Sequence, residues 1–98
     1  MKTRYKGYDD YGFEPGEEKQ LKEACRKKDF KTLTMLMVAA YKSNPGIAIE
    51  LIYSLVNGLS YDKLESINYI PVLKSDFYAY RRKCLHLFKL MREKQNGK

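Results

Sequence analysis

The feature that most constrains this chain is the spacing of its apolar residues. From Leu21 to Met91 they recur three and four positions apart, the period that places side chains on one face of an α-helix. No stretch of useful length alternates apolar and polar residues as a half-buried strand would. Turn sequences rich in Pro, Gly, Asn and Ser interrupt the pattern. The sequence therefore predicts an all-α fold of about five helices, packed as a compact bundle.

Capping signals set the expected ends of the first three helices. The first helix begins after Pro15-Gly16, and the second follows Asp29, a good N-cap, and runs to about Lys42. Its inward positions are expected to be Phe30, Leu33, Leu36, Met37 and Ala40. The third helix spans residues 47–56 and ends at Asn57-Gly58, a sequence typical of a left-handed C-cap. Apolar residues nearly surround this third helix, so we expect it to be the buried central element.

Two serines predict the starts of the last two helices. Ser60 caps a short helix with Leu64 and Ile67 facing inward, and Ser75 caps a long helix. The long helix should bury one stripe of apolar residues: Phe77, Tyr80, Cys84, Leu85, Leu87, Phe88 and Met91.

The 98 residues are expected to form a single domain. Residues 1–15 form a flexible arm, residues 17–57 a helical support and residues 60–94 a helix-turn-helix. Tyrosines in the arm either stack on nucleic acid or pack on the body, and packing or disorder is the preferred interpretation. No run of about 18 apolar residues and no secretory signal is present, so we expect a cytoplasmic protein that does not enter a membrane.

Residues that could carry chemistry are sparse. Cys25 and Cys84 lie on predicted core faces and are interpreted as apolar filler rather than as a disulfide. His86 is the single histidine, and two cysteines and one histidine at these spacings match no zinc pattern. There is no glycine-rich phosphate loop and no nucleophile with an adjacent base. We therefore expect no enzyme, no catalytic residue, no metal, no cofactor and no small-molecule substrate.

The net charge of +7 is concentrated near the C-terminus. Between Lys74 and Lys98, eight basic residues face only two acidic ones, whereas the rest of the chain is nearly balanced. A polyanion such as nucleic acid is the usual partner for this pattern. Residues 89–98 are interpreted as a solvated tail, and the basic residues from Lys74 to Lys83 as the functional ones.

The segment from Ile49 to Met91 predicts three helices in order. A buried helix ends at Asn-Gly, a short helix with an N-cap follows, and a connection leads to a basic helix with an N-cap. The residues at 58–64, Gly-Leu-Ser-Tyr-Asp-Lys-Leu, and those at 74–85 resemble the helix-turn-helix of sigma-factor region 4. The run Phe-Tyr-Ala-Tyr-Arg-Arg-Lys-Cys-Leu at 77–85 is similar to phage transcriptional regulators of the ArpU and RinA type. This resemblance implies a phage- or mobile-element-type regulator that binds double-stranded DNA, with a homodimer or RNA polymerase as a further partner.

The physical argument for DNA binding rests on the last helix. If Phe77 and Leu85 face inward, the polar residues and Ala79 lie outward or at the edge, where a helix in the major groove contacts DNA. Arg82 and Tyr78 are the first choices for reading bases, and Arg81 and Lys83 for contacting phosphates. The predicted nucleic-acid-binding residues are Lys74, Ser75, Tyr78, Arg81, Arg82 and Lys83.

Two alternatives remain open. The first is a helical adaptor or assembly protein that acts through protein–protein contacts, with Met35, Met37, Tyr53 and Leu87 facing a partner chain. The second alternative is RNA binding, in which the tyrosines would stack on bases, although no recognisable RNA module is present.

Overall fold

The computed structural model describes residues 6–96, and every element in this range is helical. The Cα atoms span 40 × 29 × 22 Å. This arrangement confirms the predicted all-α fold of about five helices. The α-helices and 3-10 turns, in chain order, are η2 (Asp9–Tyr11), α1 (Glu17–Cys25), α2 (Phe30–Ser43), η3 (Pro45–Ile47), α3 (Ala48–Asn57), α4 (Tyr61–Glu65) and α5 (Lys74–Asn96).

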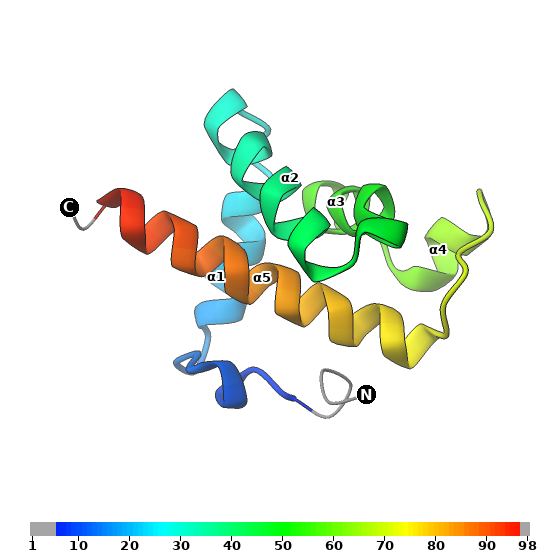
Figure 1. Cartoon of the computed structure of the whole chain (residues 1–98), viewed down its shortest axis with the longest axis horizontal. Coiled ribbons are helices and arrows are strands. Elements are labelled where there is room, and N and C mark those ends of the chain that lie inside the picture. Colours follow the sequence, from blue (N-terminus) through cyan, green and yellow to red (C-terminus); the bar gives the residue numbers. More distant parts are fainter. Residues whose placement is uncertain (1–5, 97–98) are drawn as a thin grey trace.

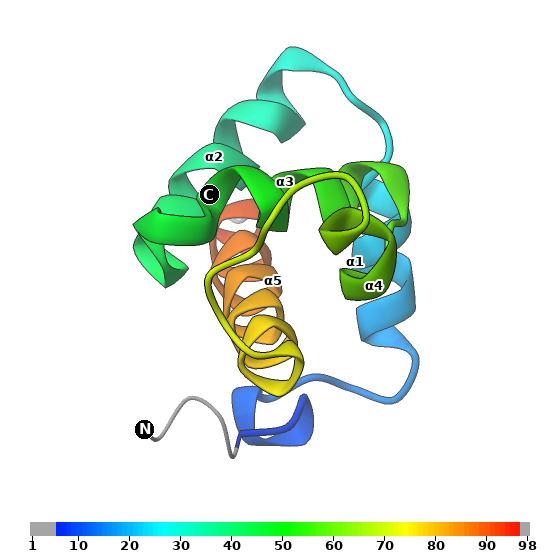
Figure 2. The same cartoon turned by 90° about the vertical axis from the view of Figure 1, so that its right-hand side faces the viewer.

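The longest helix, α5, lies at the centre of the fold. It lies along the long axis of the molecule in Figure 1, and it contacts α1, α2, α3 and α4. Figure 2 looks nearly along α5 and shows the other helices around it, with the N-terminal segment below. The side chains of Phe77, Cys84, Leu85 and Phe88 are fully buried on this helix. The predicted inward stripe of α5 is therefore confirmed at these four positions. α3 also contacts α1, α2, α4 and α5, so it shares the centre of the fold with α5.

Most of the predicted helix ends are confirmed by their capping contacts. The Asp29 carboxylate accepts a hydrogen bond from the Thr32 amide at 2.9 Å, and Ser60 Oγ accepts one from the Lys63 amide at 3.2 Å. Gly58 ends α3 with φ of 67°, the left-handed conformation that favours glycine. The prediction that Ser75 caps α5 is wrong, because the helix already begins at Lys74.

The pairing of α2 with α5 is the most extensive helix contact in the fold. Small residues on the inner side of α2, Ala39, Ala40 and Ser43, are buried and let the two helices approach closely. The Ser43 hydroxyl donates a hydrogen bond to the Tyr80 carbonyl of α5 at 2.7 Å. This register places Phe30 and Met37 on the far side of α2, with exposed fractions of 87% and 52%. Their predicted inward orientation is therefore wrong.

Two further expectations of burial are wrong. Apolar residues were expected to be buried nearly all round α3, but Ile49 is exposed, so this helix buries one face only. Beyond α4, Ile67 is 73% exposed because the short helix ends at Glu65 and the chain turns away from the core. In that connection Ile70 is buried instead, and it closes the core between α4 and α5.

The described part of the predicted N-terminal arm, residues 6–15, lies against the body. Phe13 is buried in the core, and Tyr8 and Tyr11 pack against the core partly buried. The Lys89 ammonium of α5 donates to the Gly12 carbonyl at 3.0 Å and pairs with Glu17 at 3.1 Å. The interpretation of Lys89 as part of a solvated tail is therefore wrong. The remainder of the arm, residues 1–5, and Lys98 lie outside the described residues.

Both cysteines are buried with free thiols, as expected for apolar filler. Burial raises the pKa of each thiol to about 12, so neither is a reactive thiolate near neutral pH. Across residues 6–96, no helix combines the length and apolar character needed to span a bilayer.

Candidate functional site

The first ten residues of α5 contain all six predicted nucleic-acid-binding residues. Only Lys74 and Ser75, at the start of the helix, are exposed. The other four are partly buried, and Ala79 between them is fully buried. The prediction that this stretch presents an outward face with Ala79 on it is wrong, because neighbouring elements cover α5 on several sides. Binding of nucleic acid by these residues stays a prediction.

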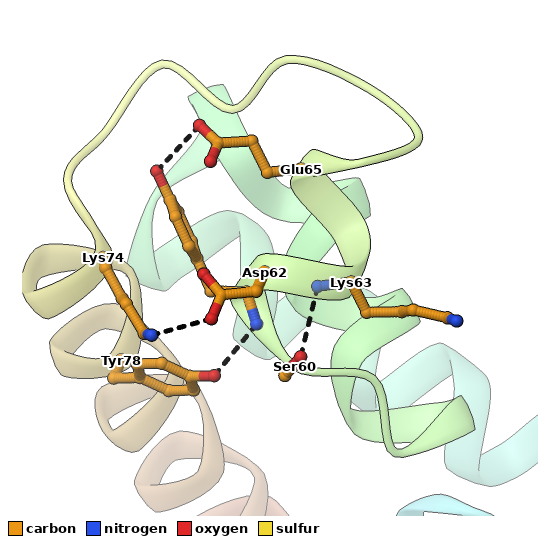
Figure 3. Close-up of polar contacts among 7 residues, drawn as sticks. Ser60, Asp62, Lys63, Glu65, Lys74 and Tyr78 are labelled. Carbon is orange, nitrogen blue, oxygen red and sulfur yellow. Dashed lines mark hydrogen bonds and ion pairs between the residues drawn. The ribbon is translucent and has the colours of Figure 1, made fainter.

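Tyr78 is positioned by α4. Its hydroxyl oxygen accepts a hydrogen bond from the Tyr61 amide at 2.9 Å, at the first residue of that helix (Figure 3). Close by, the Lys74 ammonium pairs with the Asp62 carboxylate at 2.8 Å. Two of the predicted DNA-contacting residues therefore join α4 to α5, and Tyr78 is turned toward α4 rather than outward.

Arg81 points toward α3. Its Nη1 donates to the hydroxyl of the buried Ser54 at 2.9 Å, and its guanidinium lies 4.7 Å from the centre of the Tyr78 ring. The Arg81 Nε atom is buried and has no hydrogen-bond acceptor among the described residues. A guanidinium fixed in this way is not presented as a phosphate contact on an outer face.

Arg82 and Lys83 are only partly covered. Arg82 Nε donates to the Lys6 carbonyl at 2.8 Å, so the N-terminal segment lies across this side chain. Lys83 is partly buried on the helix. The structure thus distributes the six predicted residues among α4, α3 and the N-terminal segment instead of gathering them on one surface.

A second group of basic residues comes from segments that lie far apart in the sequence. Lys27 and Lys31, at the turn between α1 and α2, line one small cavity of 170 Å³ with Arg92 from the last turns of α5. The Asp29 carboxylate also lines it, and its hydrogen bonds to Thr32 hold its pKa below the usual value. In the sequence, Lys27 belongs to the basic run Arg26-Lys27-Lys28, and only the fold brings this run close to Arg92.

The exposed side of α2 carries an apolar surface, here called the outer α2 face: Phe30, Met37, Val38 and Tyr41. Phe30, Met37 and Tyr41 follow one another at spacings of seven and four, so they share a side of the helix opposite the buried residues. Of the four residues predicted to face a partner, Met37 and Tyr53 are exposed, and Met35 and Leu87 are partly buried. The sequence missed Phe30 and Tyr41 as members of this surface.

His86 packs on the N-terminal segment. Its ring stacks on Tyr11 with centroids 4.6 Å apart, and desolvation, helped by nearby Lys89 and Lys6, lowers its pKa. Within residues 6–96, no group of three or more His, Cys, Asp and Glu side chains is arranged to hold a metal ion.

In comparisons with known proteins, the chain matches no family model, no curated protein and no solved structure.

Proposed function

We propose that this protein is a non-enzymatic helical adaptor or assembly protein, which acts through protein–protein contacts made by the outer α2 face. The observation that carries the proposal is the row of Phe30, Met37 and Tyr41, exposed on the side of α2 that faces away from the core. Large exposed apolar residues on a small domain commonly mark an interaction surface when they are contiguous. Such a row also has the spacing of a helix that docks against a partner helix.

The charge beside this surface indicates the kind of partner. Lys31 and Lys42, both exposed, lie on α2 at positions that border one edge of the row. Two copies of this chain paired face to face with antiparallel α2 helices would place these lysines on the same side of the interface, which is unfavourable. An apolar helical face with acidic residues at its rim would complement the surface, because charges across an interface steer the correct partner.

Photo-crosslinking in cells that produce the protein tests this proposal. A photoreactive amino acid at Met37 is expected to give one discrete adduct, and the same residue at the exposed Gln20 of α1 should not give it. Adding Tyr41→Lys to the Met37 probe should abolish the adduct, because a charge is buried at the interface. Identical adducts from both positions, or none from Met37, would contradict the proposal.

A second candidate, DNA binding by a phage-type regulator in the cytoplasm, is supported by the basic excess of the C-terminal quarter. The surface that suits a polyanion best is the group of Lys27, Lys31 and Arg92, together with the exposed Lys94. Non-specific duplex binding through these residues would weaken steeply as salt is raised.

Binding to random duplex DNA at low and moderate salt tests this second candidate. Replacing Lys27 and Arg92 by Gln should reduce the affinity and flatten the salt dependence. The matched pair of Arg81→Ala and Arg82→Ala tests the original helix-turn-helix interpretation. Absence of duplex binding at low salt would eliminate both versions.

A further inference from the structure

A recessed cavity between α1, α3 and α5 brings three cations together. Lys22 of α1 and Arg26, the residue that caps the C-terminus of this helix, line the cavity together with Arg81 of α5. The cavity has a volume of about 270 Å³, and none of the described residues that line it is acidic. Its lining also contains Ser54, Leu55, the turn at residues 58–60 and Tyr78.

The Arg26 side chain occupies space that the absence of a side chain at Gly58 leaves open. The Arg26 guanidinium lies directly on the Gly58 backbone, where an added Cβ would come within 3.0 Å of the arginine Cζ. Gly58 also has a positive φ of 67°, a conformation that favours glycine. Arg26 has no ion pair within the part of the chain that the structure describes.

The charge in the cavity is poorly compensated. Lys22 pairs with Glu18 at 3.0 Å, outside the cavity lining, whereas Arg81 binds the neutral Ser54 hydroxyl and lies against the Tyr78 ring. The buried Arg81 Nε has no acceptor among residues 6–96. Arg26 and Arg81 therefore have no acidic partner among the described residues.

From these observations we propose that the cavity binds the phosphate group of a small phosphorylated ligand, as a site separate from the outer α2 face. A phosphate monoester carries close to two negative charges near neutral pH and three acceptor oxygens. Guanidinium groups bind such oxygens with strong, charge-assisted hydrogen bonds. The cavity is slightly smaller than the roughly 300 Å³ at which sites for drug-sized ligands begin, so it suits a compact ligand.

No small-molecule ligand was expected from the sequence. We propose binding of the phosphate without a reaction, because no nucleophile with an adjacent base lines the cavity.

Backbone amide NMR on the full chain, titrated with inorganic phosphate and with glycerol phosphate, tests the proposal. Saturable shifts are expected at the amides of Gly58, Leu59 and Ser60 and at the Arg81 side chain, with glycerol as the uncharged control. Arg26→Gln should weaken binding by about tenfold or more, since it removes a charged donor but no structural ion pair. Lys19→Gln, which removes an exposed charge from the same helix, should leave binding unchanged.

Three results would overturn the proposal. The first is the absence of saturable shifts with either phosphate compound. The second is an equal loss of binding in Arg26→Gln and Lys19→Gln, which would show that phosphate senses only the overall charge. The third is a response of these amides to duplex DNA alone, which would assign the cavity to nucleic acid. Crosslinking through Met37 is independent of all three, so the two proposals can fail separately.

Discussion

The two helices that pack most extensively, α2 and α5, differ in how they meet the solvent. α2 buries a narrow side made largely of small residues and leaves Phe30, Met37 and Tyr41 outside. α5 buries its large residues, and its basic side chains turn toward α3, α4 and the N-terminal segment. Residue type alone therefore does not decide which side chains of these two helices are exposed. Arg81 and Arg82 of α5 are partly covered by neighbouring elements, whereas the outer α2 face meets solvent although the other side of α2 packs extensively on α5 and α3.

The largest expected effect separates two phenylalanines. Phe77→Ala in α5 should lower the free energy of unfolding by about 3–5 kcal/mol, because the side chain is fully buried and its removal leaves a cavity. Phe30→Ala in α2 should change it by less than about 0.5 kcal/mol. Urea unfolding followed by circular dichroism measures both. Equal losses would mean that the two helices do not differ in burial as described.

The next effect concerns two cations of α5. Arg81→Ala should lower the free energy of unfolding by about 1–3 kcal/mol, since it removes the bond to Ser54 and the contact with the Tyr78 ring. Lys94→Ala, at an exposed position of the same helix, should have an effect within about 0.5 kcal/mol. If Arg81→Ala is as neutral as the control, its guanidinium is free for an outside partner, as the helix-turn-helix interpretation requires.

A smaller effect compares two hydroxyls on opposite sides of α2. Ser43→Ala removes the hydrogen bond to the Tyr80 carbonyl and should destabilise the fold by about 0.5–1.5 kcal/mol. Thr34→Ala removes a bond within α2, to the Phe30 carbonyl, at an exposed site and should cost less. Thermal and urea unfolding of the pair sharpen the comparison. A greater loss from Thr34→Ala would contradict it.

The smallest effect is a pH dependence on the side of α5 that the N-terminal segment covers. Desolvation lowers the folded-state pKa of His86 below its ordinary 6.5, so the unfolded chain binds the proton more readily. The stability contribution is therefore complete above pH 6.5 and is lost as the pH falls from there through the lowered pKa. His86→Gln should flatten this part of the stability profile, while the carboxylate titrations common to both proteins remain. An unchanged profile would show that the stack on Tyr11 does not depend on a neutral ring.

Much of the secondary structure follows from short-range physics and was accessible from the sequence. Asp29 and Ser60 cap helices because their side chains reach amides three residues ahead, and Gly58 ends α3 because it tolerates a positive φ. The lone error of this kind is Ser75, where the Leu73 carbonyl already accepts a helical bond from Phe77 and the helix starts earlier. Local hydrogen bonds need only neighbouring residues, so a sequence pattern specifies them.

The candidate sites depended on contacts between distant segments. Arg81 was placed outside because the residues that cover it, Ser54 and the N-terminal segment, lie far away in the sequence. The cavity of Lys22, Arg26 and Arg81 unites residues more than fifty positions apart for the same reason.

The sequence by itself determined that this chain is helical, where most of its helices begin and end, and that Phe77, Leu85 and Phe88 form its core. Only the tertiary structure decided which helices pack together and which face of each helix meets solvent. The physical reason is the sequence separation over which each interaction acts. Caps and periodicity act within a few residues, whereas the choice of face minimises exposed apolar area and unpaired polar groups over the whole domain, and that sum depends on every helix at once.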